Sequence, residues 1–280
     1  MKKLLLSVLT LCLALCVSCK KDSNNGGGVT PTITKTLDKV YCTYINQRYI
    51  SYDNVNWELT EEEEYDHVLY SEYIYDGEKL SEFINYYNNG IISQRDTLTY
   101  SENGLITNIT EYDALSVDNC ELIYDNEVLT KVDWYSNGVM SGYLEFFYTD
   151  NKLTKAVYNS LSPAYEYVYE LTWAGDNIIQ TKGIIGDWQY VTTYEYDDKI
   201  NPYIENSALQ ALSIVYTEFS ALSKNNVISR STNLEENDTY SYQYDGDYPS
   251  EKEYCYEDVF EFDNVWYKTI TNYHYYLTYK

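Results

Sequence analysis

The chain has 280 residues, with 44 acidic side chains against 19 lysines and arginines, a formal net charge of −25 at pH 7, and 36 tyrosines. A protein this acidic repels nucleic acid, whose binding depends on cations that neutralise phosphates, and it is also repelled by anionic lipid. Acidic runs such as Glu61 to Glu64 are typical of solvated faces, and no regular loop of alternating aspartates predicts a calcium site.

The first 18 residues, MKKLLLSVLTLCLALCVS, are typical of an export signal. Two lysines precede an apolar run, Leu4 to Val17, that is shorter than the roughly 20 residues needed to span a bilayer. Cys19 follows the small residue Ser18 and precedes polar residues, as in a lipoprotein signal whose terminal cysteine takes a diacylglycerol. Cys16 stands where leucine is common in such signals. We predict lipidation at Cys19, with a simple secretory cleavage as the alternative.

Residues 19–35 are rich in Asn, Gly, Ser and Thr and predict a flexible tether. A lipid anchor followed by a tether predicts an outer-membrane location, and the sequence leaves the periplasmic and cell-surface faces both open. The sequence SCKKD, the tether and the acidic, tyrosine-rich body together resemble lipoproteins of the Bacteroidetes.

Residues 36–280 are predicted to form a single all-β domain built from a repeat. Aromatic anchors recur with gaps of 25, 24, 24, 25, 23 and 48 residues, the last being close to twice the others. Turn formers follow each anchor, and in the first five copies an aliphatic residue stands five positions after it. Seven or eight such hairpins predict a long antiparallel meander, either a curved open sheet or a soluble barrel. The anchors are Tyr75, Tyr100, Tyr124, Tyr148, Trp173, Tyr196 and Tyr244.

Tyrosine suits such a sheet because its ring packs on a pleated surface while its hydroxyl tolerates water. One segment departs from the strand pattern. Residues 203–215 carry apolar side chains near helical spacing, with Asn206 or Ser207 as a candidate N-cap. We predict one short helix there, which would plug or brace one end of the sheet.

Three segments, in order, carry a family resemblance: Y-x-Y-D-D-K-x-N-P-Y at 194–203, L-S-K-N-N at 222–226, and Y-x-Y-D-G-D-Y-P at 242–249. They resemble a family of Bacteroidetes lipoproteins of unknown function with a porin-like fold, and the Tyr-Asp phrases also resemble YD repeats of the Rhs type. The resemblance covers roughly residues 65–260. It implies a porin-like β fold and brings no catalytic residues.

The second strands of the predicted hairpins have a pattern that disfavours membrane insertion. A lipid-facing barrel needs an apolar outer face. Here Lys131, Asp133, Lys155 and Lys182 fall on one side, with polar residues on the other. The pattern therefore favours a sheet or barrel that faces water.

Few residues suggest catalysis. His67 and His274 are the two histidines, and the sequence has no G-x-S-x-G elbow, no zinc-ligand spacing and no phosphate-binding glycine loop. Cys42, Cys120 and Cys255 allow one disulfide or three free thiols. We therefore predict no catalytic set, no metal site and no cofactor.

Exposed aromatic side chains are the best candidates for function. Among the tryptophans, Trp134 and Trp188 are the least constrained by the repeat and are the predicted ligand-stacking residues, with structural packing as the alternative role. The predicted function is a lipid-anchored, non-catalytic binding or envelope-organising module whose partner is a neutral glycan or another envelope protein. The alternative is a carbohydrate- or peptide-active hydrolase that uses paired carboxylates.

Overall fold

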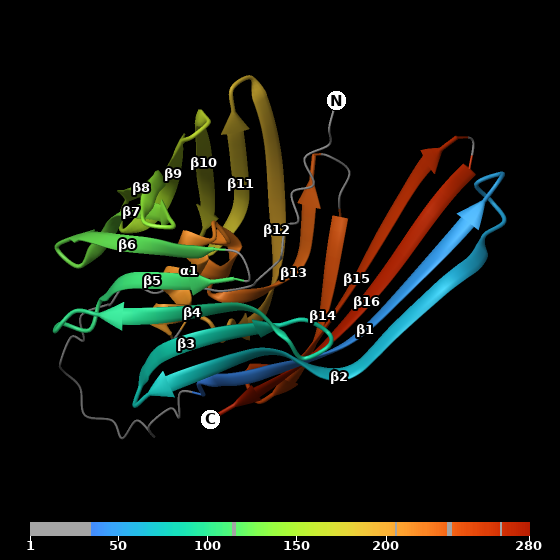
Figure 1. The fold of residues 1–280 in the computed structure, drawn as a ribbon, viewed down its shortest axis with the longest axis horizontal. Helices are drawn as coiled ribbons and strands as arrows, with labels where there is room; N and C mark the ends of the chain where they lie inside the picture. Colours follow the sequence, from blue (N-terminus) through green and yellow to red (C-terminus); the bar gives the residue numbers. More distant parts are fainter. Residues whose placement is uncertain (1–34, 114–115, 205, 234–236, 264) are drawn as a thin grey trace.

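The computed structural model describes residues 35–280 except 114–115, 205, 234–236 and 264. The described residues form a closed barrel of sixteen antiparallel strands in chain order, and β16 pairs with β1 to complete the ring (Figure 1). The all-β meander is confirmed, and of its two predicted forms the barrel is correct and the curved open sheet is wrong. The strands are β1 (Leu37–Ser51), β2 (Glu58–Asp76), β3 (Lys79–Tyr86), β4 (Ile92–Tyr100), β5 (Ile106–Tyr112), β6 (Val117–Asp125), β7 (Val128–Ser136), β8 (Val139–Thr149), β9 (Lys152–Leu161), β10 (Ala164–Ala174), β11 (Asn177–Ile185), β12 (Trp188–Ile200), β13 (Asn225–Thr232), β14 (Asn237–Asp245), β15 (Tyr248–Phe262) and β16 (Val265–Tyr279).

The repeat forms hairpins with tight turns, as the sequence predicts. In the β6–β7 hairpin, Asn126 and Glu127 adopt φ values of 48° and 66°, the left-handed conformation that two-residue hairpin turns require. The ladder register shifts just before Tyr124, which pairs with Leu129 across the turn. The same shift occurs before Tyr148, which pairs with Leu153. The aromatic-to-aliphatic spacing therefore marks a bulge beside each turn.

The anchor side chains link one repeat to the next. The hydroxyl of Tyr148 donates to the carbonyl oxygen of Leu129 at 2.9 Å, and that of Tyr100 donates to the carbonyl oxygen of Leu80 at 2.6 Å. In each case the acceptor is the aliphatic residue of the preceding repeat. Burial raises the pKa of Tyr100 and that of Tyr124 to about 12. The anchors are thus tyrosine or tryptophan because the position needs a ring that carries a hydrogen-bond donor.

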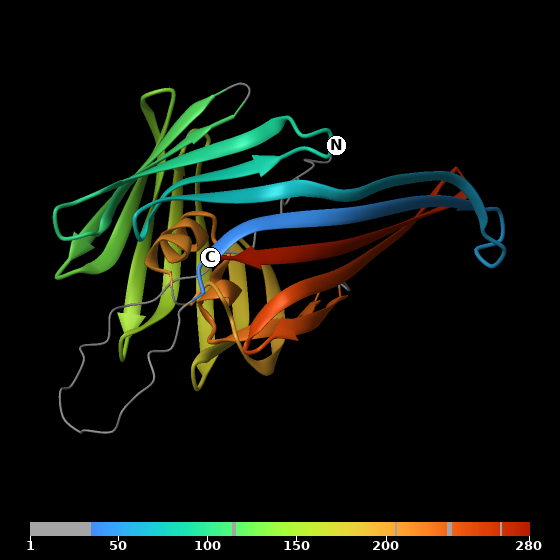
Figure 2. The ribbon, with the colours of Figure 1, turned by 90° about the horizontal axis from the view of Figure 1, so that it is seen from below.

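A helix fills the barrel interior. Helix α1 (Ser207–Val215) lies inside the ring of strands and is followed by the 3₁₀ turn η1 (Phe219–Leu222) (Figures 1 and 2). Asn206 caps the helix by accepting from the backbone N–H groups of Ala208 and Leu209. Residues 208–215 are all buried, and they pack with inward-facing residues such as Phe83 and Leu144. The predicted helix is confirmed, with its start at Ser207, and it occupies the interior.

Charged side chains lie on the outer side of the central strands, together with exposed apolar ones such as Phe147 and Ile179. Lys131 forms an ion pair with Asp133 at 2.6 Å, and Lys182 pairs with Glu170 at 3.4 Å. Lys155 is exposed and lies over the ring of Phe147. The inward-facing side of these strands carries the buried apolar residues Val132 and Ala156 as well as the polar Thr181, so the prediction of polar residues on that side is only partly correct. No helix in the described part of the chain is long and apolar enough to span a membrane.

Four long strands leave the barrel wall together. The distal parts of β1, β2, β15 and β16 extend to one side as a narrow sheet, here called the arm, which consists of residues 44–51, 58–66, 254–262 and 265–273 (Figures 1 and 2). A row of tyrosine rings crosses its base, from Tyr254 to Tyr273 to Tyr44, at centroid distances of 5.8 and 5.2 Å. Because these rings contact one another on directly paired positions, they stabilise the arm where it joins the barrel.

Candidate ligand-binding pocket

Trp134 lies near the C-terminal end of β7, with its ring on the inner side of the barrel wall. It pairs with Gly142 of β8, and its ring meets the edge of the Tyr158 ring at a centroid distance of 4.8 Å. A Cβ atom on Gly142 would lie 2.7 Å from the carbonyl oxygen of Asn159 and 3.0 Å from the Tyr158 ring. The glycine therefore allows the Tyr158 ring to approach β8 closely beside Trp134.

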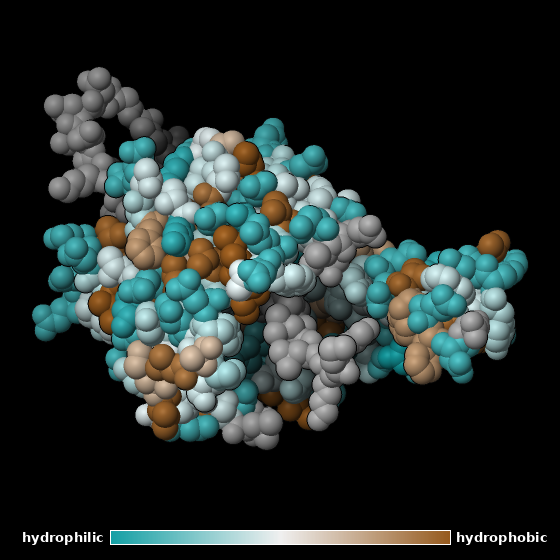
Figure 3. Space-filling view, turned by 90° about the horizontal axis from the view of Figure 1, so that it is seen from above, coloured by the Kyte–Doolittle hydropathy of each residue, from teal (hydrophilic) through white to brown (hydrophobic). Residues whose placement is uncertain are grey.

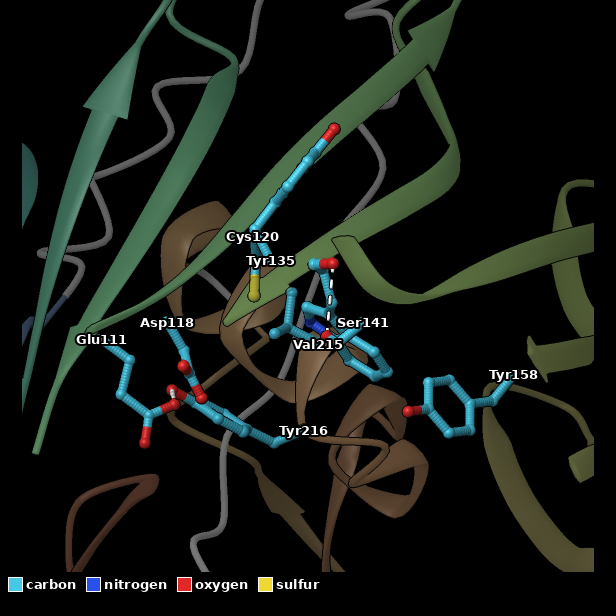
Figure 4. Close-up of a pocket in the computed structure, with 9 residues that line it drawn as sticks. Glu111, Asp118, Cys120, Tyr135, Ser141, Tyr158, Val215 and Tyr216 are labelled. Carbon is cyan, nitrogen blue, oxygen red and sulfur yellow. Dashed lines mark hydrogen bonds between the residues drawn. The ribbon is translucent and has the colours of Figure 1, made fainter. Parts of the chain in front are cut away.

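These two rings contribute to a cavity of about 240 Å³ between the barrel wall and the end of α1. Figure 4 shows the carboxyl groups of Glu111 and Asp118 directed toward the Tyr216 hydroxyl, with the Tyr158 hydroxyl pointing inward from the other side. The cavity has aromatic rings on one part of its lining and carboxyl groups on another, and no basic residue lines it. The lining residues are Glu111, Asp118, Cys120, Trp134, Tyr135, Ser141, Tyr158, Val215 and Tyr216.

Tyr216, the C-cap of α1, contacts two acidic side chains at the wall of the cavity. Its hydroxyl lies 3.0 Å from Asp96 Oδ2 and 3.1 Å from Glu111 Oε2, and it accepts a hydrogen bond from Gln94 Nε2 at 2.9 Å. Because a phenol has one proton to donate, it cannot donate to both carboxylates at once. The arrangement therefore favours a proton on one of the two carboxyl groups.

Burial disfavours charge in this cluster. Asp96 has no exposed surface, and its burial, reinforced by the neighbouring Glu111, raises the pKa of Asp96 to about 7. Burial also raises the pKa of Glu111. The Cys120 thiol has its pKa raised by burial and by the same acids, so it is held in the unreactive thiol form. Burial therefore favours the protonated form of the two acids that contact the Tyr216 hydroxyl.

The second predicted stacking residue lies elsewhere. Trp188 begins β12, has 56% of its surface exposed, and is not among the residues that line the cavity. Its closest ring contact is Tyr190, at 6.4 Å between centroids. The structure therefore places Trp134 in a pocket and Trp188 on an open surface, and it does not bring the two together. The predicted lipidation residue, Cys19, lies outside the described residues.

The two histidines lie near one tyrosine, on strands far from the pocket in the strand order. The rings of His67 and His274 both contact the ring of Tyr276, at centroid distances of 4.8 and 4.3 Å. His274 Nε2 also lies 2.7 Å from Glu251 Oε2. Cys42 and Cys120 are buried free thiols and Cys255 is an exposed one, so no disulfide links the three. Within the described residues, no group of three or more His, Cys, Asp or Glu is placed to hold a metal ion.

The solved structures that resemble this chain do so at low sequence identity and low TM-score. No family model and no curated protein sequence matches the chain. A porin-like protein from Bacteroides uniformis has 11% identity over 85% of this chain and 97% of its own, with a TM-score of 0.49. A porin-like protein from Bacteroides vulgatus has 13% identity over 88% and 99%, with a TM-score of 0.28. A TcdB2-TccC3-Cdc42 structure has 12% identity over 77% of this chain and 13% of its own, with a TM-score of 0.31.

Proposed function

We propose that the protein is a lipid-anchored, non-catalytic binding module of the cell envelope, and that its ligand is a neutral sugar unit held in the Trp134 pocket. The observation that carries this proposal is the meeting of the Trp134 and Tyr158 rings in one cavity with the carboxyl groups of Glu111 and Asp118. Aromatic rings contact the apolar C–H faces of a sugar, while carboxyl oxygens accept hydrogen bonds from its hydroxyl groups.

The size and charge of the cavity support this ligand class. At about 240 Å³ it lies somewhat below the roughly 300–1,000 Å³ of pockets for drug-sized ligands, which suits a single sugar ring. Acidic residues without a lining base disfavour anionic ligands such as uronic acids or phosphates. A neutral polyhydroxylated ring satisfies both the aromatic and the carboxyl parts of the lining.

Catalysis by paired carboxylates is the second candidate, and one contact favours it. Asp96 and Glu111 hydrogen-bond the same hydroxyl, so the two carboxyl groups lie close together, as the pair in a retaining glycosidase does. However, Asp96 is fully buried behind Tyr216 and does not line the cavity. A nucleophile must reach the anomeric carbon, so we propose binding without turnover.

The envelope location follows from the sequence. The signal-like residues 1–18, Cys19 and the tether precede a barrel whose outer side carries ion pairs such as Lys182–Glu170. Such a surface suits water better than lipid hydrocarbon. The proposal therefore places the barrel beside the membrane, held by the anchor.

Calorimetric titration tests the proposal. The chain from residue 20 onward would be titrated with neutral monosaccharides and oligosaccharides, including glucose, galactose, mannose, xylose and their short polymers. Binding of at least one sugar is expected, with affinity reduced at least tenfold in Trp134→Ala and unchanged in the matched control Trp188→Ala. Equal affinity in the two variants would exclude the pocket. Release of reducing ends that stops in Glu111→Gln would favour the hydrolase instead.

A further inference from the structure

The arm has two edges that no described strand covers. β15 pairs with β14 only as far as Tyr254, and β2 pairs with β3 only from Ser71 onward. Beyond these points β15 has β16 on one side, and β2 has β1 on one side, with no ladder partner on the other side among the described residues. Each edge therefore presents backbone N–H and C=O groups that can pair with a further strand.

The two edges differ in chemistry. The β2 edge carries the run Glu61 to Glu64, and charge of this density is a common means of blocking strand addition. The β15 edge, Cys255–Phe262, combines three acids with aromatic and β-branched residues of high β-propensity. Val259, Phe260 and Phe262 have 41, 50 and 69% of their surface exposed, and hydrophobic side chains are visible among hydrophilic ones on the arm in Figure 3. Every residue of this segment is exposed, so both of its faces are open to solvent as well as its edge.

Charge decides which strand this edge accepts. Glu257, Val259 and Glu261 share one face of β15 because side chains alternate along a strand. An antiparallel pair with a second copy, centred on Val259, would place Glu257 directly opposite Glu261, and like charges on paired positions are destabilising. The nearest base, Lys268 of β16, lies 3.7 Å from Glu257 and does not balance the other acids. A strand with lysine or arginine at alternate positions satisfies these carboxylates.

We propose that the β15 edge, Cys255–Phe262, binds an extended basic segment of another protein by strand addition. The backbone ladder supplies affinity, Glu257 and Glu261 select lysine or arginine, and Val259 lies between them on the same face to contact the aliphatic stem of the intervening lysine or arginine. This surface does not involve the Trp134 pocket and does not depend on sugar binding.

The test uses three eight-residue peptides with blocked ends: alternating Lys and Val, alternating Glu and Val, and the Lys–Val peptide with two central prolines. The chain from residue 20 onward should bind the Lys–Val peptide, bind the other two at least tenfold more weakly, and lose affinity as salt is raised. Amide hydrogen exchange should slow at residues 255–262 when the peptide is bound.

Charge reversal gives the decisive comparison. The double change Glu257→Lys with Glu261→Lys should weaken Lys–Val binding at least tenfold and allow the Glu–Val peptide to bind. The matched double change on the other edge, Glu62→Lys with Glu64→Lys, should leave the Lys–Val affinity within twofold of the unchanged chain. Absence of Lys–Val binding, binding that survives the β15 reversal, or protection located outside residues 255–262 would overturn the proposal. So would a dimer of the unchanged chain, seen by sedimentation, that the β15 reversal abolishes.

Discussion

The indole Nε1 of Trp173 donates a hydrogen bond of 2.7 Å to the carbonyl oxygen of Leu153, one repeat earlier in the chain. Tyr196 makes the same contact one repeat later, to the carbonyl oxygen of Ile178 at 2.5 Å. These two carbonyl groups lie beside turns where the ladder register shifts, and in each case the next anchor donates to them. The repeat is therefore a chain of side-chain to backbone contacts as well as a pattern of strands.

Removing one anchor hydroxyl should destabilise the barrel. Tyr148→Phe keeps the ring but leaves the carbonyl oxygen of Leu129 without its donor, which costs about 1–3 kcal/mol of unfolding free energy. Urea unfolding followed by circular dichroism measures the difference. The control is Tyr87→Phe at an exposed position, which should change stability by less than about 0.5 kcal/mol. Equal effects at the two positions would show that the anchor contact contributes nothing.

The turn between β6 and β7 offers a stabilising change. Glu127 adopts a φ of 66°, which strains any residue with a Cβ, whereas glycine adopts this conformation freely. Glu127→Gly should therefore leave stability unchanged or raise it by up to about 1 kcal/mol. Thr130→Gly, inside strand β7, should lower stability, because glycine loses more backbone entropy on folding and has no side chain to pack there. Thermal unfolding of both variants gives the comparison.

Gly142 tests the packing of the pocket wall. A methyl group there would meet the backbone of Asn159 and the Tyr158 ring, so Gly142→Ala should cost about 1–3 kcal/mol by overpacking. The double variant with Tyr158→Leu relieves the ring contact and should recover part of the loss. If Gly142→Ala proves neutral, the close approach of Tyr158 to β8 is not a feature of the folded protein.

The buried acids predict how stability depends on pH. Asp96 has a folded pKa of about 7, above that of an aspartate in the unfolded chain, so the unfolded state loses its proton first as pH rises. The stability that this carboxyl contributes is fully present below about pH 4 and is lost as pH rises toward 7. Glu218, whose pKa burial also raises to about 7, acts in the same direction.

Asp96→Asn should remove this contribution. The variant is expected to be more stable than the unchanged chain at pH 8 by a few kcal/mol, on the order of 4, because it has no buried carboxyl group to ionise. At pH 4 the difference should nearly vanish. Melting temperatures measured from pH 4 to 8 decide the matter, and parallel curves for the two proteins would contradict a buried, neutral Asp96.

The anchor prediction concerns residues outside the described structure. Cys19→Ala should abolish incorporation of labelled fatty acid and move the protein to the soluble fraction of a cell lysate. Cys16→Ala is the matched control and should leave both unchanged. Labelling that persists in Cys19→Ala and disappears in Cys16→Ala would move the lipidated residue to Cys16.

Much of the fold can be predicted because the repeat is local. The anchor, the turn and the following aliphatic residue lie within about six residues, so their spacing specifies each hairpin without knowledge of the rest. Barrel closure could not be predicted in this way, because it depends on pairs such as Leu37 with Tyr279 at opposite ends of the chain. The arm could not be predicted either, because the alternation of side chains in β1 and β16 continues unchanged from the barrel wall into the arm.

The candidate site is predictable only in part. Trp134 stands out in the sequence because it lies outside the anchor positions. Tyr216 and Glu111 come together from the helix and β5, and among 44 acids no local signal distinguishes Glu111. Asp96 does carry such a signal, because it stands two and four residues before Leu98 and the anchor Tyr100. Strand alternation therefore places this acid on the inner face of the barrel.

Tryptophan fluorescence during sugar titration reports directly on the pocket, because a sugar bound there lies against one particular indole. The chain from residue 20 onward, its Trp134→Phe variant and its Trp188→Phe variant would each be titrated with the sugar that calorimetry selects. We expect a saturable spectral change that is retained in Trp188→Phe and lost in Trp134→Phe. A change retained in Trp134→Phe and lost in Trp188→Phe would contradict sugar binding in the pocket, since binding would then occur on the open surface.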